Sequence, residues 1–132
     1  MRRTPRVAVT RTYPFRPCHR LRAAADFERV YRSGRRAGDG LFAVNALANE
    51  AGFARLGMAV SARTVGNAVR RNRVRRIIRE LFRLRHATLP ALDFVVTSRP
   101  GARDAARTAI ETSLERLIAE ATRRVTAPPL KH

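Results

Sequence analysis

Apolar and polar residues alternate along three short segments of the chain, which predicts three β-strands. In residues 41–48 the apolar side chains fall on alternate faces, and residues 55–61 repeat this pattern. Residues 93–98 form a short apolar run that is typical of a buried strand. The turn-forming sequence Asn-Glu-Ala-Gly at 49–52 separates the first two segments. We therefore expect residues 41–48 and 55–61 to pair as an antiparallel hairpin.

Apolar residues spaced three and four apart predict three helices. The first covers residues 23–33, and the last begins after Asp104 and runs to about residue 121. The central helix, at about residues 70–86, has the sharpest pattern. Its apolar stripe consists of Val74, Ile77, Ile78, Leu81 and Leu84.

The other side of the central helix is almost entirely arginine. Arg71, Arg75 and Arg79 form one i, i+4 row, and further arginines flank it. A helix exposed only to water usually intersperses acids to relieve repulsion between like charges, but Glu80 is the only acid in this helix. The pattern therefore favours an external polyanion as the partner of this face.

The order of these elements, α-β-β-(β)-α-β-α with one optional strand, predicts an α+β fold. We expect a two-layer α/β sandwich in which helices pack on a single sheet. A chain of 132 residues has room for one domain. We expect a flexible basic arm at residues 1–19, one domain at 20–124 and a tail at 125–132.

Composition narrows the class of partner. The net charge is +18 and the pI is about 12.0, which favours nucleic acid first and an anionic membrane second. Cys18 is the only cysteine, so an internal disulfide and a cysteine-rich zinc site are excluded, and a reducing cytoplasm fits. No run of about 18 apolar residues exists that would span a membrane.

The stretch that leads into the basic helix carries a family signature. The sequence Arg-Leu-Gly-Met-Ala-Val-Ser at 55–61, followed by Gly-Asn-Ala-Val-Arg-Arg-Asn-Arg-Val-Arg-Arg at 66–76, closely resembles that of the bacterial ribonuclease P protein subunit. The resemblance extends over residues 20–118 in the same order. It departs from the family at Ala62-Arg63-Thr64, where the family usually has a lysine-rich turn.

The resemblance implies an accessory subunit of a ribonucleoprotein. In that family the complex removes the 5′ leader of precursor tRNA by hydrolysing one phosphodiester. The RNA subunit catalyses the reaction with Mg²⁺, and the protein supplies no catalytic residue, binds no cofactor of its own and is monomeric before assembly. The resemblance also implies a left-handed β-α-β connection around the basic helix, although right-handed connections are the general rule.

Two sets of binding residues follow from this resemblance, together with Gly66 and Asn67 as structural residues at the start of the basic helix. The set expected to bind the catalytic RNA is Arg63, Arg70, Arg71, Asn72, Arg73, Arg75, Arg76 and Arg79. The set expected to bind the leader of precursor tRNA, between the first helix and the open sheet face, is Arg20, Arg22, Phe27, Arg29, Tyr31, Phe42 and Val44. Two alternatives stay open: Phe27 as a core residue, and Asn72 as a residue that fixes the helix to a loop.

The ten acidic residues are dispersed, and no pair has the spacing of a metal site. Two-metal phosphodiester chemistry needs clustered carboxylates, so we expect no catalytic site and no metal site in the protein. The alternative function is a ribosomal or other nucleic-acid-binding protein without catalytic activity.

Overall fold

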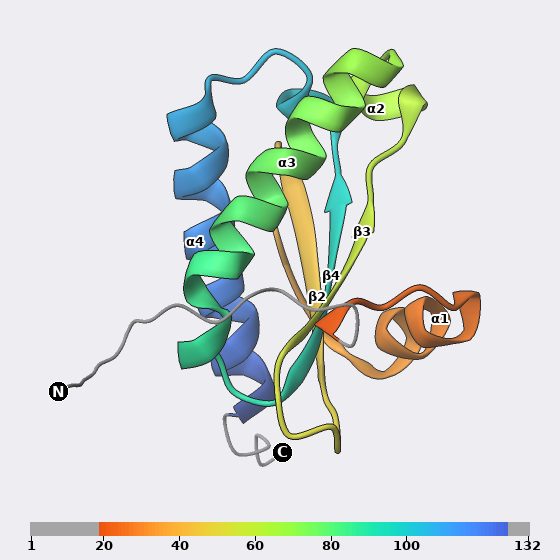
Figure 1. Ribbon diagram of the computed structural model, residues 1–132, viewed down its shortest axis with the longest axis vertical. Helices are drawn as coiled ribbons and strands as arrows, with labels where there is room; N and C mark the ends of the chain where they lie inside the picture. The colour runs from red at the N-terminus through yellow and green to blue at the C-terminus, as the bar shows by residue number, and fades with distance from the viewer. Residues whose placement is uncertain (1–18, 127–132) are drawn as a thin grey trace, which may run out of the picture.

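The structure is a computed structural model that describes residues 19–126, so most of the expected arm (1–18) and the end of the expected tail (127–132) lie outside the described residues. Figure 1 shows one sheet with helices packed on it, which confirms the predicted α+β class. The elements in chain order are α1 (Ala24–Ser33), β1 (Arg35–Gly38), β2 (Phe42–Ala48), β3 (Arg55–Ala59), α2 (Ala62–Val65), α3 (Ala68–Arg85), β4 (Leu92–Ser98) and α4 (Arg107–Thr126).

The strands lie in the order β1-β2-β4-β3, with β2 antiparallel to both neighbours and β3 parallel to β4. The predicted hairpin between residues 41–48 and 55–61 is therefore wrong, because β4 separates β2 from β3. β4 is buried along almost its whole length, which suits a central strand that hydrogen-bonds on both edges. The hairpin in the structure joins β1 to β2. At its turn the Asp39 carboxylate accepts hydrogen bonds from the N–H groups of Leu41 and Phe42.

The main hydrophobic core lies between the sheet and the two long helices, α3 and α4. The apolar stripe of α3 is buried as predicted, with one exception. Leu84 is 58% exposed, whereas Phe82, at the other margin of the stripe, is buried. Phe82 packs edge-to-face on Phe94 of β4, with ring centroids 5.9 Å apart. Because this aromatic contact is large, α3 is rotated so that the Phe82 margin of the stripe faces the core and the Leu84 margin faces outward.

The connection from β3 to β4 is left-handed, as the family resemblance implies. In Figure 1, α3 lies in front of the sheet, the parallel strands β3 and β4 run upward, and the chain passes from β3 to β4 on its left. Because α3 is the body of this crossover, its position over the sheet depends on both parallel strands.

α1 packs on the opposite face of the sheet, across β4. Its apolar contacts form a small cluster of Leu21, Val30 and Val95, with Phe27 partly buried against it. The Phe27 ring covers Gly57, where an added Cβ would lie 2.7 Å from the Phe27 Cζ. Phe27 is thus largely a packing residue. The face that carries α1 has far fewer apolar contacts than the face that carries α3 and α4.

Candidate nucleic-acid interface

α3 begins at a capped turn that follows the short helix α2. The Asn67 side chain accepts a hydrogen bond from the N–H of Arg70 at 3.0 Å, which satisfies a free donor at the helix start. Gly66, just before it, has a φ of 107°, a left-handed value that strains residues with a Cβ. These observations agree with the structural roles predicted for both residues. The turn fixes where α3 starts and which face it turns outward.

The row of Arg71, Arg75 and Arg79 runs along the margin between α3 and the β3 edge of the sheet. All three side chains are half-buried. Arg75 Nη2 lies 3.4 Å from the carbonyl oxygen of Val60, just after β3, and donates to it. Arg79 lies near Arg20, on the segment that pairs with β3. The row therefore faces one flank of the helix and lies closer to the sheet than its position opposite the apolar stripe predicts.

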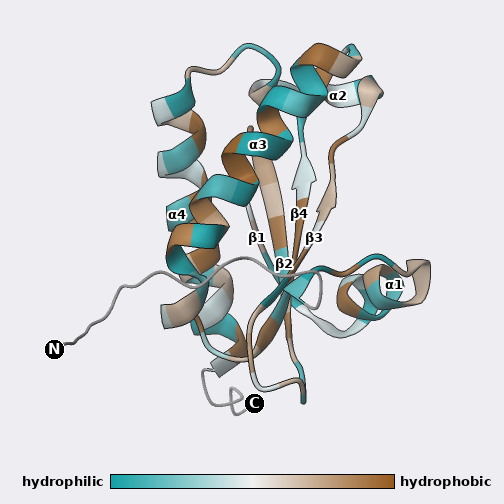
Figure 2. Cartoon of the chain, viewed as in Figure 1, coloured by the Kyte–Doolittle hydropathy of each residue, from teal (hydrophilic) through white to brown (hydrophobic). Residues whose placement is uncertain are grey.

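Positive charge is crowded along α3 and only partly neutralised by ion pairs of Arg70, Arg83 and Arg85 with acids. The helix carries eight arginines and one glutamate, a formal charge of +7. Glu80 is engaged by Arg83 Nη2 at 2.6 Å. Burial, followed by the repulsion of three neighbouring arginines, lowers the pKa of Arg79 from its ordinary value. Figure 2 shows the result as hydrophilic bands that alternate with hydrophobic ones along α3.

The other predicted RNA-binding residues extend this surface. Asn72 and Arg76 are exposed on α3, and Arg63 is exposed on α2. Arg73 donates to the carbonyl oxygen of Ala105 at 3.1 Å, and Arg70 lies 3.7 Å from the carboxylate of Asp104. Both partners are in the segment that precedes α4. We call the eight predicted residues, as a group, the α3 basic surface. It is continuous along the helix, although the fold already uses one donor of Arg73.

The aromatic residues predicted to bind the leader do not gather at one place. Tyr31 is 39% exposed on α1, and its hydroxyl shares a hydrogen bond with that of Thr97 in β4 at 3.1 Å. Phe42 and Val44 are fully buried in the main core. The prediction that they line a cleft beside α1 is wrong, because alternation along β2 points both toward α3 and α4, on the other side of the sheet.

The three arginines predicted to bind the leader are also spread out. Arg20 lies along the β3 edge beside Arg79, so it belongs with the α3 basic surface. Arg22 is exposed in the segment before α1. Arg29 lies on α1, but it is drawn into an ion pair with Asp93 of β4. Only Arg22 and Arg29 thus stay close to α1.

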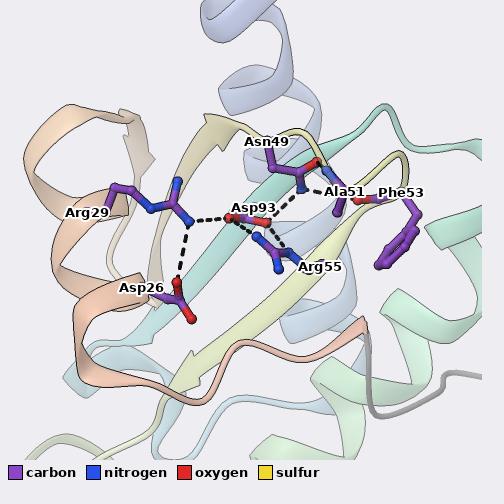
Figure 3. A network of polar contacts seen from close by, with 7 residues as sticks. All are labelled: Asp26, Arg29, Asn49, Ala51, Phe53, Arg55 and Asp93. Carbon is purple, nitrogen blue, oxygen red and sulfur yellow. Dashed lines mark hydrogen bonds and ion pairs between the residues drawn. The ribbon is translucent and has the colours of Figure 1, made fainter.

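Asp93 is the centre of a polar cluster that joins α1, β4 and the β2–β3 region (Figure 3). Its side chain has no exposed surface. Oδ1 accepts from Arg55 Nε at 2.8 Å and Asn49 Nδ2 at 2.7 Å, and Oδ2 accepts from Arg55 Nη2 at 2.9 Å and Arg29 Nη2 at 2.7 Å. Burial alone would raise the pKa of Asp93, but these hydrogen bonds outweigh it and hold the pKa below its ordinary value. The carboxylate is therefore ionised and fully satisfied.

Sequence reasoning missed this cluster and the polar residues of the open sheet face. Asp93 was read only as the start of a strand, although an acid that begins a strand of buried residues needs buried partners. Thr97 follows Asp93 by four positions and so lies on the same face. Alternation along β2 also places Asn45 on this face of the sheet. It is 2% exposed, and its Oδ1 has no hydrogen-bond partner among the described residues.

Within residues 19–126, no three His, Cys, Asp or Glu side chains come together in a way that could hold a metal ion. No helix in the same region is long and apolar enough to cross a membrane. The described side chains therefore offer a basic surface and a polar sheet face, but no donor set for Mg²⁺.

Known proteins resemble the chain over most of its length. A model of the family described as Ribonuclease P matches residues 15–122. The ribonuclease P protein component of Syntrophobacter fumaroxidans is 51% identical over 90 residues, which cover 67% of this chain and 75% of that protein. That of Salmonella newport is 39% identical over 98 residues, which cover 74% and 82%.

Solved structures agree with this result. The RNase P protein of Staphylococcus aureus superposes with a TM-score of 0.74 at 36% identity, and the match covers 78% of this chain and 94% of that one. The RNase P protein of Thermotoga maritima gives a TM-score of 0.69 at 28% identity, with 76% and 96% covered.

Proposed function

Because the chain belongs to the ribonuclease P protein family, we propose that it binds the catalytic RNA of ribonuclease P and the 5′ leader of precursor tRNA. Family membership gives it a role in tRNA processing. The observation that carries the finer proposal is the charge of α3. Its +7 is far more than the fold requires and matches a polyanionic partner.

The α3 basic surface docks on the phosphates of the catalytic RNA. Guanidinium groups bind phosphate oxygens in a bidentate geometry, and those of α3 are held at the helix surface by burial of their stems. The Nε of Arg71 is buried and has no partner among the described residues, so one donor is unused. Asn72 is exposed, and its amide oxygen faces only Arg75 Nη1 at 3.4 Å in the same helix. This geometry supports an RNA contact for Asn72 rather than a tie to a loop.

The leader binds along the flank of α1 that carries Tyr31. Single strands are held by base stacking on aromatic rings, worth about 1–3 kcal/mol per base, beside basic side chains. Tyr31 supplies a partly exposed ring next to Thr97 of the open sheet face. Arg22 is an exposed cation in the segment that leads into α1. Phe42 and Val44 take no part, because both are buried.

Catalysis belongs to the RNA subunit, which also holds the Mg²⁺ ions. Two acids of the described region are used by the fold: Asp93 neutralises arginines, and Asp39 accepts hydrogen bonds from the turn after β1 and from Ser113. We expect the protein to be a monomer before assembly and to act in the cytoplasm, which suits a chain with a single cysteine.

Reconstitution tests the proposal. The full chain is added to the catalytic RNA and precursor tRNA at low Mg²⁺, and leader cleavage is compared with RNA alone. We expect clear stimulation and tighter binding of precursor than of mature tRNA. Absence of stimulation, combined with equal binding of unrelated structured RNAs, would favour the alternative of a general nucleic-acid-binding protein.

A further inference from the structure

α1 is attached to the sheet at two points on β4. At one flank, Arg29 Nη2 lies 2.7 Å from Asp93 Oδ2 at the start of the strand. At the other flank, the Tyr31 hydroxyl meets that of Thr97 near the end of the strand. Asp93 and Thr97 are four residues apart, which corresponds to about 13 Å along a strand. The two contacts therefore set the angle at which the helix crosses β4.

Between these two points, apolar packing is sparse. The fully buried cluster under α1 consists of Leu21, Val30 and Val95, with only Phe27 and Leu47 packed partly buried against it, whereas the core on the other face of the sheet involves both long helices. Val30 stands between Arg29 and Tyr31 in the sequence. Its packing holds α1 on the sheet but leaves the direction of the helix to the polar contacts. The polar contact at Asp93 is thus a major constraint on how α1 is oriented.

Arg29 is not needed to compensate the negative charge of the Asp93 carboxylate. Arg55 already binds both carboxylate oxygens, at 2.8 and 2.9 Å, and Asn49 donates to Oδ1 at 2.7 Å. Asp93 lies at the far flank of the helix from Tyr31, so Arg29 does not share the surface where we expect the leader. The Arg29 contact therefore adds a tether for α1 to a carboxylate that is already satisfied.

We propose that Arg29 is a positioning residue for leader recognition, because its bond to Asp93 fixes where the Tyr31 ring stands at the other end of β4. The inference rests on the proposed leader-binding role of Tyr31. It departs from the sequence-based expectation that Arg29 itself contacts the leader. Arg29 acts through Tyr31 and makes no contact with RNA.

A double-mutant cycle in the reconstituted holoenzyme tests this proposal. The quantity measured is the ratio of the Kd for mature tRNA to the Kd for precursor tRNA, for Arg29→Ala, Tyr31→Ala and the double variant. The matched control is Arg32→Ala, which removes the same charge from the same helix. The Arg32 side chain is 72% exposed, and among the described residues its ion pair is with Glu28 of the same helix, at 3.6 Å.

We expect Arg29→Ala and Tyr31→Ala each to lower the ratio by about three- to fivefold, and the double variant to be no worse than the stronger single variant, as for residues that act as one unit. Arg32→Ala should leave the ratio unchanged. Arg29→Lys should restore part of it, because an ammonium can make a single bond to Asp93. A purely structural role would lower the melting temperature without changing the ratio.

Two outcomes overturn the proposal while the leader-binding function stands. In the first, Arg29→Ala behaves like Arg32→Ala. In the second, the effect of Arg29→Ala adds in full to that of Tyr31→Ala, which would make Arg29 an independent RNA contact. Failure of the proposed function looks different, because the wild-type holoenzyme would then bind precursor and mature tRNA equally.

Discussion

α3 and α4 lie side by side on the same face of the sheet, yet their outer faces differ sharply. Both helices bury an apolar stripe against the main core. α4 carries four arginines and three glutamates, a formal charge of +1, whereas α3 carries +7. On α4 three of the four arginines are paired with glutamates of the same helix, as in Arg107–Glu111 at 2.9 Å and Arg124–Glu120 at 2.6 Å, and the fourth, Arg116, is paired with Asp39.

The difference in charge between α3 and α4 separates what the fold requires from what the function requires. A helix in this position is stable with balanced charges, as α4 demonstrates, so the excess charge of α3 does not serve packing. Repulsion among its arginines opposes folding, and it adds to burial, the larger cause, in lowering the pKa of Arg79. The inner faces thus carry the fold, and the outer face of α3 carries the excess charge that we propose for RNA binding.

The buried apolar stripes, which α3 and α4 share, should give the largest effect when they are mutated. Phe82→Ala on α3 and Leu114→Ala on α4 should each lower the free energy of unfolding by about 3–4 kcal/mol, because both side chains are almost fully buried. Urea denaturation measures this change. Leu84→Ala is the control and should cost less than about 0.5 kcal/mol, because Leu84 is exposed. A cost for Leu84→Ala similar to that of Phe82→Ala would contradict the orientation of α3.

The exposed charges, in which the two helices differ, should give the next largest effect when they are reversed. Arg75→Glu/Arg76→Glu on α3 should weaken binding of the catalytic RNA by about a hundredfold or more, since each charged hydrogen bond is worth about 1.5–3 kcal/mol. Arg123→Glu/Arg124→Glu on α4 makes the same change in net charge and should weaken binding less than about threefold. Filter binding at fixed salt measures both. Equal losses would show that net charge, and not the α3 basic surface, determines affinity.

The helices were predictable because their patterns are local. The spacing of Val74, Ile77 and Ile78 indicates both the helix and its buried side, and the expected range of 70–86 is close to Ala68–Arg85. The order of the strands was not predictable in the same way. Nothing within residues 41–61 reveals that β4, more than 30 residues later, inserts between β2 and β3.

The candidate site was predictable as a set of residue types but not as a set of contacts. The arginines of α3 were identified, whereas their engagement by the fold depends on distant neighbours, such as the carbonyl of Ala105 that Arg73 binds. Alternation divides β2 into two faces without indicating which one α1 covers. Phe42 and Val44 were assigned to the wrong face for that reason.

The salt dependence of RNA binding should also distinguish α3 from α4. We expect the logarithm of the RNA affinity to fall steeply with the logarithm of salt concentration, since counterions are released from each neutralised phosphate. Arg76→Ala should reduce this slope by about one and weaken binding by about three- to tenfold. Arg116→Ala on α4 should leave the slope unchanged, because Arg116 is paired with Asp39 at 2.6 Å. An unchanged slope for Arg76→Ala would exclude it as a phosphate contact.

The smallest effect comes from removing two acids of α4. Glu111→Gln/Glu120→Gln raises the charge of that helix from +1 to +3 and keeps Glu115, which pairs with Arg85 of α3 at 2.5 Å. We expect binding of an unstructured RNA at low salt to rise by only about two- to threefold, because loosely placed charge adds only screened, non-specific attraction. Stimulation of leader cleavage should stay at the wild-type level. Greater stimulation would mean that a second charged helix can do what α3 does, and the distinction between the two helices would then reduce to charge alone.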